Sequence, residues 1–306
     1  MTNNKLLLGV DLGGTKIEAA LLNRDGEVVH RKRSPTPIDS YAGLLSKIRR
    51  LCEDLESSAG LSRPLPLGIC TPGSPSPATG LMRNCNSTIL NGQLLRADLE
   101  SRCGRPVRIA NDADCLVLSE TSDGAGSSAR SVFGVILGTG VGGGLFINGA
   151  LLQGPNAVSG EWGHNRMPLE RLPALPDQLL KPRPCYCGRL DCIETWLSGP
   201  GLALTHERLH REPINVEQLH SQQLDAKHRE TLSAYTQMLA AALAGVINIV
   251  DPEVIVLGGG LSNIDVIYAS MPDLLQAQVF SDISLTEVRA AQHGDSSGVR
   301  GAAWLW

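Results

Sequence analysis

The chain has 306 residues, enough for two domains with separate cores, and its 27 basic and 31 acidic residues give a net charge of −4. It has no block of basic residues and only 4% aromatic residues, which argues against binding nucleic acid through phosphate contacts or base stacking. No apolar run reaches the ~18 residues of a membrane span. We therefore expect a cytoplasmic protein that binds neither nucleic acid nor a membrane.

The first part of the chain predicts a β-meander followed by a helix. The runs Leu6–Leu12, Thr15–Leu22 and Glu27–Arg33 have the length and composition of strands, and Gly26 suits a turn that requires positive φ. Apolar residues recur at helical spacing over Tyr41–Ser57. Sheet followed by helix indicates an α/β domain.

The same pattern of strand, glycine turn and strand starts again near residue 121, which predicts a second, similar half. A long helix is predicted over Thr231–Ile249, before a proline that cannot continue it. The stretch Arg166–Pro184 lacks periodicity and is interpreted as a loop. Three further strands are predicted at Leu65–Cys70, Val107–Ala110 and Val254–Leu257.

Three glycine-rich turns each follow a short apolar run. Glycine after a strand lets backbone N–H groups approach an anion with no Cβ in the way. One such turn is more often a plain tight turn, but three in this order indicate a nucleotide held between two halves of the molecule. The turns are Asp11-Leu12-Gly13-Gly14-Thr15, Gly138-Thr139-Gly140-Val141-Gly142-Gly143-Gly144 and Gly258-Gly259-Gly260.

The first two turns also carry polar side chains suited to a nucleotide. Asp11 stands at a strand end, where a carboxylate can hold Mg²⁺ through water, because magnesium retains much of its hydration. Thr15 and Thr139 are candidates for hydrogen bonds to phosphate, and Lys16 is either a phosphate ligand or a solvated side chain. The expected nucleotide-binding residues are Asp11, Gly13, Gly14, Thr15, Lys16, Thr139, Gly140, Gly258, Gly259 and Gly260.

Asp112 follows the predicted strand Val107–Ala110 and is the candidate catalytic residue. A hydroxyl that attacks phosphorus needs a carboxylate to accept its proton and orient it. The alternative is that Asp112 caps a helix running through Leu116 to Glu120. The two roles are compatible, because capping also fixes the carboxylate. Asp114 is a weaker candidate for the base.

Cys185, Cys187 and Cys192 lie within eight residues and suit a tetrahedral metal that lacks one ligand. His164 is the best candidate for the fourth ligand. Such a Cys₃His set is a closed structural zinc site, so we expect no metal-bound catalytic water. The alternative is three packed cysteines. The chain's other five cysteines are scattered and are interpreted as buried thiols.

A second histidine motif, His206-Glu207-Arg208-Leu209-His210, matches the H-E-x-x-H pattern of zinc proteases. Its flanking residues are polar, and no substrate-cleft motif accompanies it. We interpret it as an exposed helix.

Taken together, these motifs make the chain resemble the ROK family (repressors, open reading frames, kinases), and within it the bacterial fructokinase or mannokinase branch. The resemblance covers essentially the whole chain. It is carried by Asp11–Lys16, Thr71–Gly73, Asn84–Thr88 with Leu90–Gly92, Asn111-Asp112, Gly138–Gly144, Gly160–His164, the cysteine cluster with Ile193-Glu194, Val256–Gly260 and His293–Trp306.

The resemblance implies two actin-like, ribonuclease-H-like α/β domains with a ligand cleft between them. Residues 1–118 and 293–306 would form the first domain, to which the C-terminal segment returns as a helix. Residues 119–292 would form the second domain, with the zinc loop. The resemblance also implies a homodimer. Because only ten residues precede Asp11, we do not expect a DNA-binding repressor of the same family.

The implied reaction is transfer of the γ-phosphate of ATP to the 6-hydroxyl of fructose, with mannose as a second candidate sugar, and with Mg²⁺ and a structural Zn²⁺. The alternatives are a kinase of N-acetylglucosamine, N-acetylmannosamine or glucose, or a sugar sensor, although a sensor is expected to lack the Asp112 carboxylate. Asp112 matches the catalytic base. The matched sugar-binding positions are Gly73, Asn86, Asn111, Asp112, Glu161, His164 and Glu194.

Two details of the zinc loop follow from the resemblance. His164 would bind zinc through one ring nitrogen and sugar through the other, because the metal fixes the ring and its tautomer. The family usually has glycine before the third cysteine, where this chain has Asp191. Asp tolerates a positive φ better than most residues do.

Overall fold

The computed structural model describes residues 6–172, 174–221 and 223–306. The chain divides into two compact units. The first comprises Met1–Ser128, Ala150–Ser159 and Gln292–Trp306, and the second comprises Ala129–Gly149 and Gly160–Ala291. Each unit has its own sheet and its own buried core.

The first unit is built on a five-stranded sheet in the order β3-β2-β1-β4-β7. β1 pairs antiparallel with β2 and parallel with β4, so the predicted β-meander is followed by a helical crossover. Gly26, in the β2–β3 turn, has φ +83°, as predicted. The elements are β1 (Leu7–Leu12), β2 (Lys16–Leu22), β3 (Val28–Pro35), α1 (Tyr41–Ser58), β4 (Leu67–Thr71), β5 (Ser74–Pro75), β6 (Met82–Arg83), α2 (Leu95–Cys103), β7 (Val107–Asn111), α3 (Asp112–Asp123) and α8 (Ser297–Ala303).

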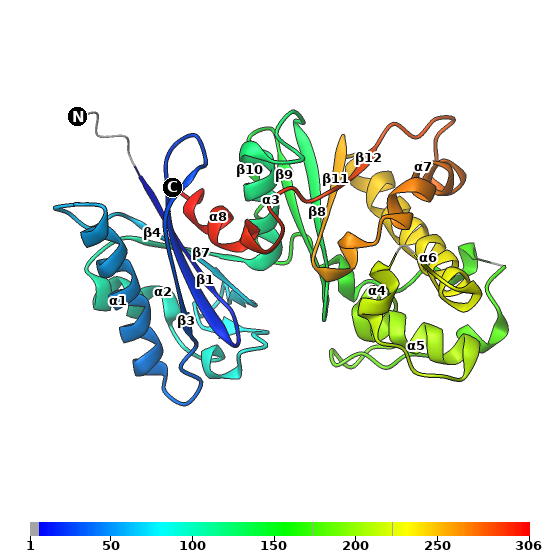
Figure 1. The fold of residues 1–306 in the computed structure, drawn as a ribbon, viewed down its shortest axis with the longest axis horizontal. Helices are drawn as coiled ribbons and strands as arrows, with labels where there is room; N and C mark the ends of the chain where they lie inside the picture. Colours follow the sequence, from blue (N-terminus) through cyan, green and yellow to red (C-terminus); the bar gives the residue numbers. More distant parts are fainter. Residues whose placement is uncertain (1–5, 173, 222) are drawn as a thin grey trace. The chain divides into compact units, whose positions relative to one another are not determined.

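Helices cover both faces of this sheet (Figure 1). Successive residues of β1 point to opposite faces: Leu8 packs in the cluster that contains α1, and Leu7 packs against Val299 of α8. The C-terminal helix α8 lies very close to the sheet, since a Cβ on Gly68 would come within 1.7 Å of the Ala302 carbonyl oxygen. The end of the chain is therefore an integral layer of the first unit.

The sheet of the second unit has the strand order β10-β9-β8-β11-β12, and its short edge strand β10 lies in the segment Ala150–Ser159 that groups with the first unit. β8 pairs antiparallel with β9 and parallel with β11, which repeats the strand–turn–strand opening of the first unit. The elements are β8 (Ser131–Leu137), β9 (Val141–Ile147), β10 (Ala150–Leu151), α4 (Glu194–Leu197), α5 (Gly199–His210), α6 (Ala226–Val250), β11 (Val254–Gly258), α7 (Val266–Gln278) and β12 (Glu287–Ala290).

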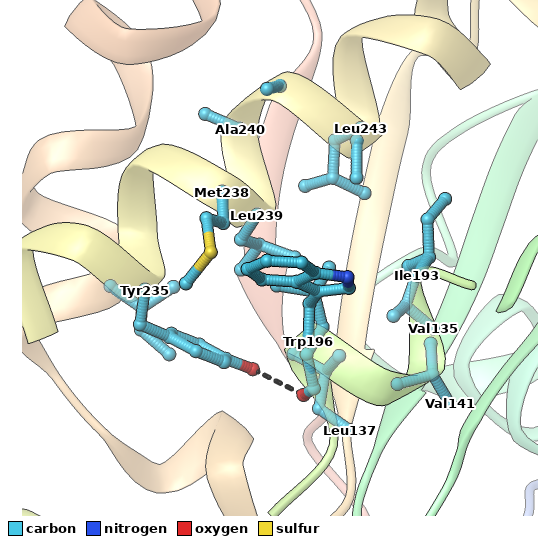
Figure 2. Packing of buried hydrophobic residues seen from close by; sticks show 14 of the residues in the cluster. Val135, Leu137, Val141, Ile193, Trp196, Tyr235, Met238, Leu239, Ala240 and Leu243 are labelled. Carbon is cyan, nitrogen blue, oxygen red and sulfur yellow. Dashed lines mark hydrogen bonds between the residues drawn. The ribbon is translucent and has the colours of Figure 1, made fainter. Parts of the chain in front are cut away.

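Helix α6 forms the centre of the second unit's core. Its apolar side chains, including Met238 and Leu243, surround the fully buried indole of Trp196, and the Tyr235 hydroxyl donates a 2.9 Å hydrogen bond to the Leu197 carbonyl (Figure 2). By length and composition α6 could cross a membrane, but 61% of its most apolar window is buried inside this core. It is the core helix of a folded unit.

Candidate functional site

Asp112 is the first residue of α3 and directly follows β7. The helix cap is Asn111, whose Oδ1 accepts a hydrogen bond from the Asp114 amide at 2.7 Å, so the alternative in which Asp112 caps the helix is wrong. The helix begins one residue earlier than that alternative implies, because the asparagine side chain satisfies the free amide of the third helical residue. Asp112 Oδ1 accepts from the Ala113 amide at 2.9 Å. A carboxylate in the first turn is stabilised by the helix dipole.

Asp11, near the end of β1, is electrostatically repelled by the carboxylate of Asp112. Burial raises the pKa of Asp11 to about 6, and repulsion from Glu18 and Asp112 adds to the rise, while a hydrogen bond with the Cys70 thiol and the charge of Lys16 oppose it. A divalent cation bound near Asp11 would relieve this repulsion, because Mg²⁺ prefers carboxylate and water oxygens.

The first glycine turn joins β1 to β2. The Gly13 amide donates to the Lys16 carbonyl at 3.0 Å, and the Thr36 hydroxyl donates to the Gly13 carbonyl at 2.8 Å. A Cβ on Gly14 would meet no atom within 4 Å. Gly14, Thr15 and Lys16 are exposed, so the turn is open to a ligand.

The other candidate sugar ligands of the first unit lie on loops that close contacts hold in place. Gly73 has φ +76°, and a Cβ there would lie 2.3 Å from the Arg83 carbonyl oxygen, so only glycine fits. The Asn91 side chain bonds both the amide and the carbonyl of Cys85, at 3.0 and 3.1 Å. It thereby fixes the loop that carries Asn86.

In the second unit, Glu194 connects the cysteine cluster to the second glycine turn. It begins α4, two residues after Cys192, and its Oε2 accepts a hydrogen bond from the Val141 amide at 3.0 Å. A Cβ on Gly140 would lie 2.7 Å from the same oxygen. Gly140 is therefore needed where the Glu194 carboxylate reaches the turn.

Glu161 and His164 lie in and next to a 3₁₀ turn, Trp162–His164, that packs on β9. Trp162 Nε1 donates to the Gly142 carbonyl at 3.0 Å, and a Cβ on Gly143 would lie 2.8 Å from the indole. The glycine turn itself ends at Gly140. The following glycines, expected to be part of it, belong to β9 and leave room for this segment.

His164, Cys185, Cys187 and Cys192 come together, with their ligand atoms all within 4.8 Å of one another. Cys187 Sγ lies 3.6 Å from Cys192 Sγ, and Cys185 Sγ lies 3.7 Å from His164 Nδ1. Ligand atoms around a tetrahedral zinc are ~3.5–3.8 Å apart, given metal–sulfur bonds of about 2.3 Å and metal–nitrogen bonds of about 2.0 Å. These residues therefore fit a structural zinc ion.

The two nitrogens of His164 face different groups. Nδ1 faces the thiols, whereas Nε2 lies 3.0 Å from the hydroxyl of Tyr186, a side chain that is 75% exposed. A metal on Nδ1 would leave Nε2 for a polar ligand. Tyr186 was not among the predicted site residues, because one tyrosine between two cysteines carries no signal of its own.

Asp191 adopts φ +58°, in the left-handed region where the family usually has glycine. Its Oδ1 accepts a hydrogen bond from the Arg183 amide at 2.9 Å, and its own amide donates to the Arg183 carbonyl at 2.8 Å. The side chain thus makes a bond that glycine cannot, which offsets the backbone strain.

The second and third glycine turns open onto a cavity of about 530 Å³ within the second unit. Two of the ten predicted nucleotide residues, Thr139 and Gly260, line it, together with Gly138 of the second turn. Gly259, in the third turn, has φ +83°, and a Cβ added there would lie 2.5 Å from the Leu137 carbonyl oxygen. Only glycine therefore fits at this position. Sequence reasoning missed the remaining wall, which includes Ala203, Ile214, Val216, Glu217, His220 and Leu261.

The H-E-x-x-H motif lies at the end of α5. His206 is only 1% exposed, so the expectation of an exposed helix is wrong for this residue. His206 Nδ1 and His210 Nε2 both lie within hydrogen-bond distance of the Thr231 hydroxyl, at 2.9 and 3.2 Å. In the part of the chain that the structure describes, neither histidine joins the Cys/His group. Their nitrogens are engaged by α6, which gives the motif a packing role.

A comparison with protein families matches the ROK family over residues 7–306. The chain is 38% identical over 299 residues to an N-acetyl-D-glucosamine kinase of Pectobacterium atrosepticum, covering 97% of both chains. It is 37% identical over 299 residues to the N-acetyl-D-glucosamine kinase of Escherichia coli O139:H28, covering 97% of this chain and 98% of the relative.

Solved structures agree with this family. A ROK hexokinase from Thermus thermophilus superposes with a TM-score of 0.83 at 27% identity, covering 98% of this chain and 97% of the other. A ROK family glucokinase from Streptomyces griseus, in complex with glucose and AMPPNP, superposes with a TM-score of 0.75 at 26% identity, covering 98% of each chain. The two units are therefore the α/β, actin-like domains that the resemblance implied.

Proposed function

The chain belongs to the ROK family and is an ATP-dependent sugar kinase, and we propose that its substrate is N-acetyl-D-glucosamine, phosphorylated at the 6-hydroxyl. The observation that carries the proposal is the 37–38% identity, over 97% of the chain, to kinases named for this sugar. The fructokinase branch expected from the sequence is not the one these relatives name. N-acetyl-D-glucosamine is one of the alternative substrates that the family resemblance allows, and it replaces fructose as the proposed substrate.

In the proposed reaction, Asp112 accepts the proton of the 6-hydroxyl while the hydroxyl oxygen attacks the γ-phosphorus. The new oxygen–phosphorus bond forms as the bond between the γ-phosphorus and the bridging oxygen breaks, and ADP leaves with that oxygen. Support comes from the position of Asp112 in the first turn of α3, where hydrogen bonds to neighbouring amides orient it and its cap. Most of the rate enhancement would come from positioning the two reactants.

We assign the nucleotide to the cavity in the second unit. Its apolar wall of Ala203, Ile214 and Val216 suits a purine face, while Glu217 and His220 offer polar groups at the edge. Thr139 and the neighbouring glycine amides would bind phosphate oxygens. Asp11 and the first glycine turn would hold Mg²⁺ and the terminal phosphates. When bound, Mg²⁺ would neutralise the negative charge that develops on the phosphate oxygens during phosphoryl transfer.

In the first unit, the proposed sugar ligands are Gly73, Asn86 and Asn111. In the second unit, they are Glu161, His164 and Glu194. Zinc bound to Nδ1 would fix the His164 ring and present Nε2 to a sugar hydroxyl. The proposed zinc is structural, because four protein ligands close its coordination shell. A cytoplasmic location and a homodimer stay predictions.

The test is ADP release by the purified protein with Mg-ATP and five sugars: N-acetylglucosamine, N-acetylmannosamine, glucose, mannose and fructose. We expect the highest kcat/KM with N-acetylglucosamine. A higher value with another sugar would replace the substrate and leave the mechanism standing. No turnover on any sugar, with the protein folded and zinc bound, would contradict the kinase assignment for these substrates.

A further inference from the structure

Glu120, in the last turns of α3, is completely buried, and its carboxylate accepts four hydrogen bonds. Oε2 accepts from the amides of Ala125 and Gln292, both at 2.9 Å. Oε1 accepts from the amide of His293 at 3.0 Å and from the hydroxyl of Ser297 at 3.2 Å. An ionised carboxylate offers about four acceptor positions, so each of them is filled.

The partners of this carboxylate lie where the chain passes between the two units. Gln292 is the residue at which the chain returns to the first unit for the last time, and Ala291 is the last residue of the second unit. The Ala291 amide donates to the Leu257 carbonyl of β11 at 2.8 Å. Two consecutive amides are thus hydrogen-bonded to different units, that of Ala291 to the second and that of Gln292 to the first. Any bend of the backbone at this crossover is therefore confined to the dihedral angles between these two amides.

The chain crosses between the units four times, and the crossover described above is the last of them. The first crossover, between Ser128 and Ala129, also has an anchored amide on each side, although these two amides are four residues apart. On the first unit's side, the amide of Gly126 donates to the Glu120 carbonyl at 2.9 Å, in addition to the bond from Ala125. On the second unit's side, the Arg130 amide donates to the Glu253 carboxylate at 3.0 Å. Glu120 therefore ties the near ends of both crossovers to one helix turn.

The same helix begins with Asp112. Glu120 is eight positions after Asp112 in the same helix, which at ~1.5 Å per residue is a rigid span of ~12 Å. One turn further on, Asp123 adds a second attachment, because its carboxylate accepts from His293 Nε2 at 2.7 Å and pairs with Arg300 of α8. Helix α3 thus carries the proposed base at one end and the anchors of both crossovers at the other.

We propose that Glu120 is a positioning residue: it locks the first and the last of the four crossovers to α3, so that the base Asp112 keeps its orientation while the chain bends at these two crossovers. This role rests on the proposed function only in naming Asp112 as the base. Glutamine at position 120 would keep one acceptor oxygen and would turn an NH₂ group toward amide donors, so at least two of the four bonds would be lost.

The experiment compares Glu120→Gln with Ser297→Ala. The second variant removes one donor to the same carboxylate but leaves the crossover amides bonded, so it is the matched control. Residue-resolved hydrogen exchange, without sugar or nucleotide, should show the amides of Gln292 and His293 exchanging at least ~10-fold faster in Glu120→Gln. The Ala291 amide should not change, and Ser297→Ala should match the wild type at all three amides.

The kinetic arm uses whichever sugar is turned over fastest. We expect Glu120→Gln to lower kcat at least ~10-fold and to change the sugar KM less than kcat, because the base is misoriented while the sugar ligands remain. Unchanged exchange at Gln292 and His293 would overturn the proposal, as would a wild-type kcat despite faster exchange. If Glu120→Gln does not fold, Glu120→Asp, which keeps the charge but is one methylene shorter, takes its place with the same expectations. The exchange result does not depend on the identity of the sugar.

Discussion

The carboxylate of Glu194 accepts a hydrogen bond of 3.0 Å from the backbone amide of Val141. This bond joins the helix that follows the cysteine cluster to the end of the second glycine turn. A residue proposed to bind sugar is therefore in direct contact with a turn proposed to bind nucleotide. Any change that displaces the carboxylate should therefore alter the binding of both the sugar and the nucleotide.

Gly140→Ala tests this contact. The added Cβ would lie 2.7 Å from Glu194 Oε2, so the carboxylate must move and its bond to Val141 must break. We expect the sugar KM to rise about tenfold, since a hydrogen bond to a charged group is worth about 1.5 kcal/mol. Gly245→Ala, in α6 and outside the proposed binding residues, is the control, because its Cβ would meet no atom within 4 Å. Equal kinetics for the two variants would contradict the proposed role of Glu194.

Asp112→Asn tests the proposed base. The amide cannot accept the hydroxyl proton, so turnover should fall roughly 10²–10⁴-fold. Sugar binding, measured by calorimetry without nucleotide, should remain near that of the wild type. Asp114→Asn serves as the comparison, because Asp114 lies in the same turn and was the rival candidate. Turnover close to wild type in Asp112→Asn, or a larger loss in Asp114→Asn, would argue against the assignment.

The zinc prediction is checked by metal analysis of the pure protein. We expect one zinc per chain, lost in Cys187→Ala together with thermal stability and sugar affinity, because metal binding is coupled to local order. His206→Ala should retain the zinc, since His206 is engaged with Thr231. Far less than one equivalent in the wild type, or loss of zinc in His206→Ala alone, would contradict the Cys₃His site.

Asp11 should make stability depend on pH. Its pKa is about 6 in the folded protein against 3.8 for a free side chain, so the folded state binds this proton more tightly. The cost of burying the charge is absent below pH ~4 and grows as pH rises through ~6, to at most about 3 kcal/mol. In urea unfolding without Mg²⁺, the advantage of Asp11→Asn over wild type should rise across this range, and added Mg²⁺ should shrink it. A difference independent of pH would count against this account of Asp11.

Local patterns were enough to predict several parts of the molecule. The β-meander, the helix over residues 41–57 and the long helix of the second half follow from periodicity and turn residues, and the structure contains them. The four metal-ligand candidates were chosen from spacing and chemistry, and their ligand atoms lie within 4.8 Å of one another. The need for positive φ at position 191 followed from the family's glycine, and Asp191 has it.

Features that depend on distant contacts could not be predicted in this way. Glu120 is an ordinary helical glutamate in the sequence, and its partners at 292, 293 and 297 lie more than 170 residues away. His206 looked exposed because its immediate neighbours are polar, but α6 covers it. The apolar wall of the cavity that we propose for the nucleotide includes Ile214 and Val216, which belong to no motif.

A competition assay between two sugars tests most directly whether N-acetyl-D-glucosamine is the substrate. Equal concentrations of N-acetyl-D-glucosamine and fructose, with Mg-ATP and the wild-type protein, give initial product rates whose ratio is the ratio of the two kcat/KM values. NMR of the products identifies the phosphorylated carbon. We expect N-acetylglucosamine 6-phosphate in at least ~10-fold excess over fructose phosphate. Predominant fructose phosphate, or phosphate on a hydroxyl other than the 6-hydroxyl, would contradict it.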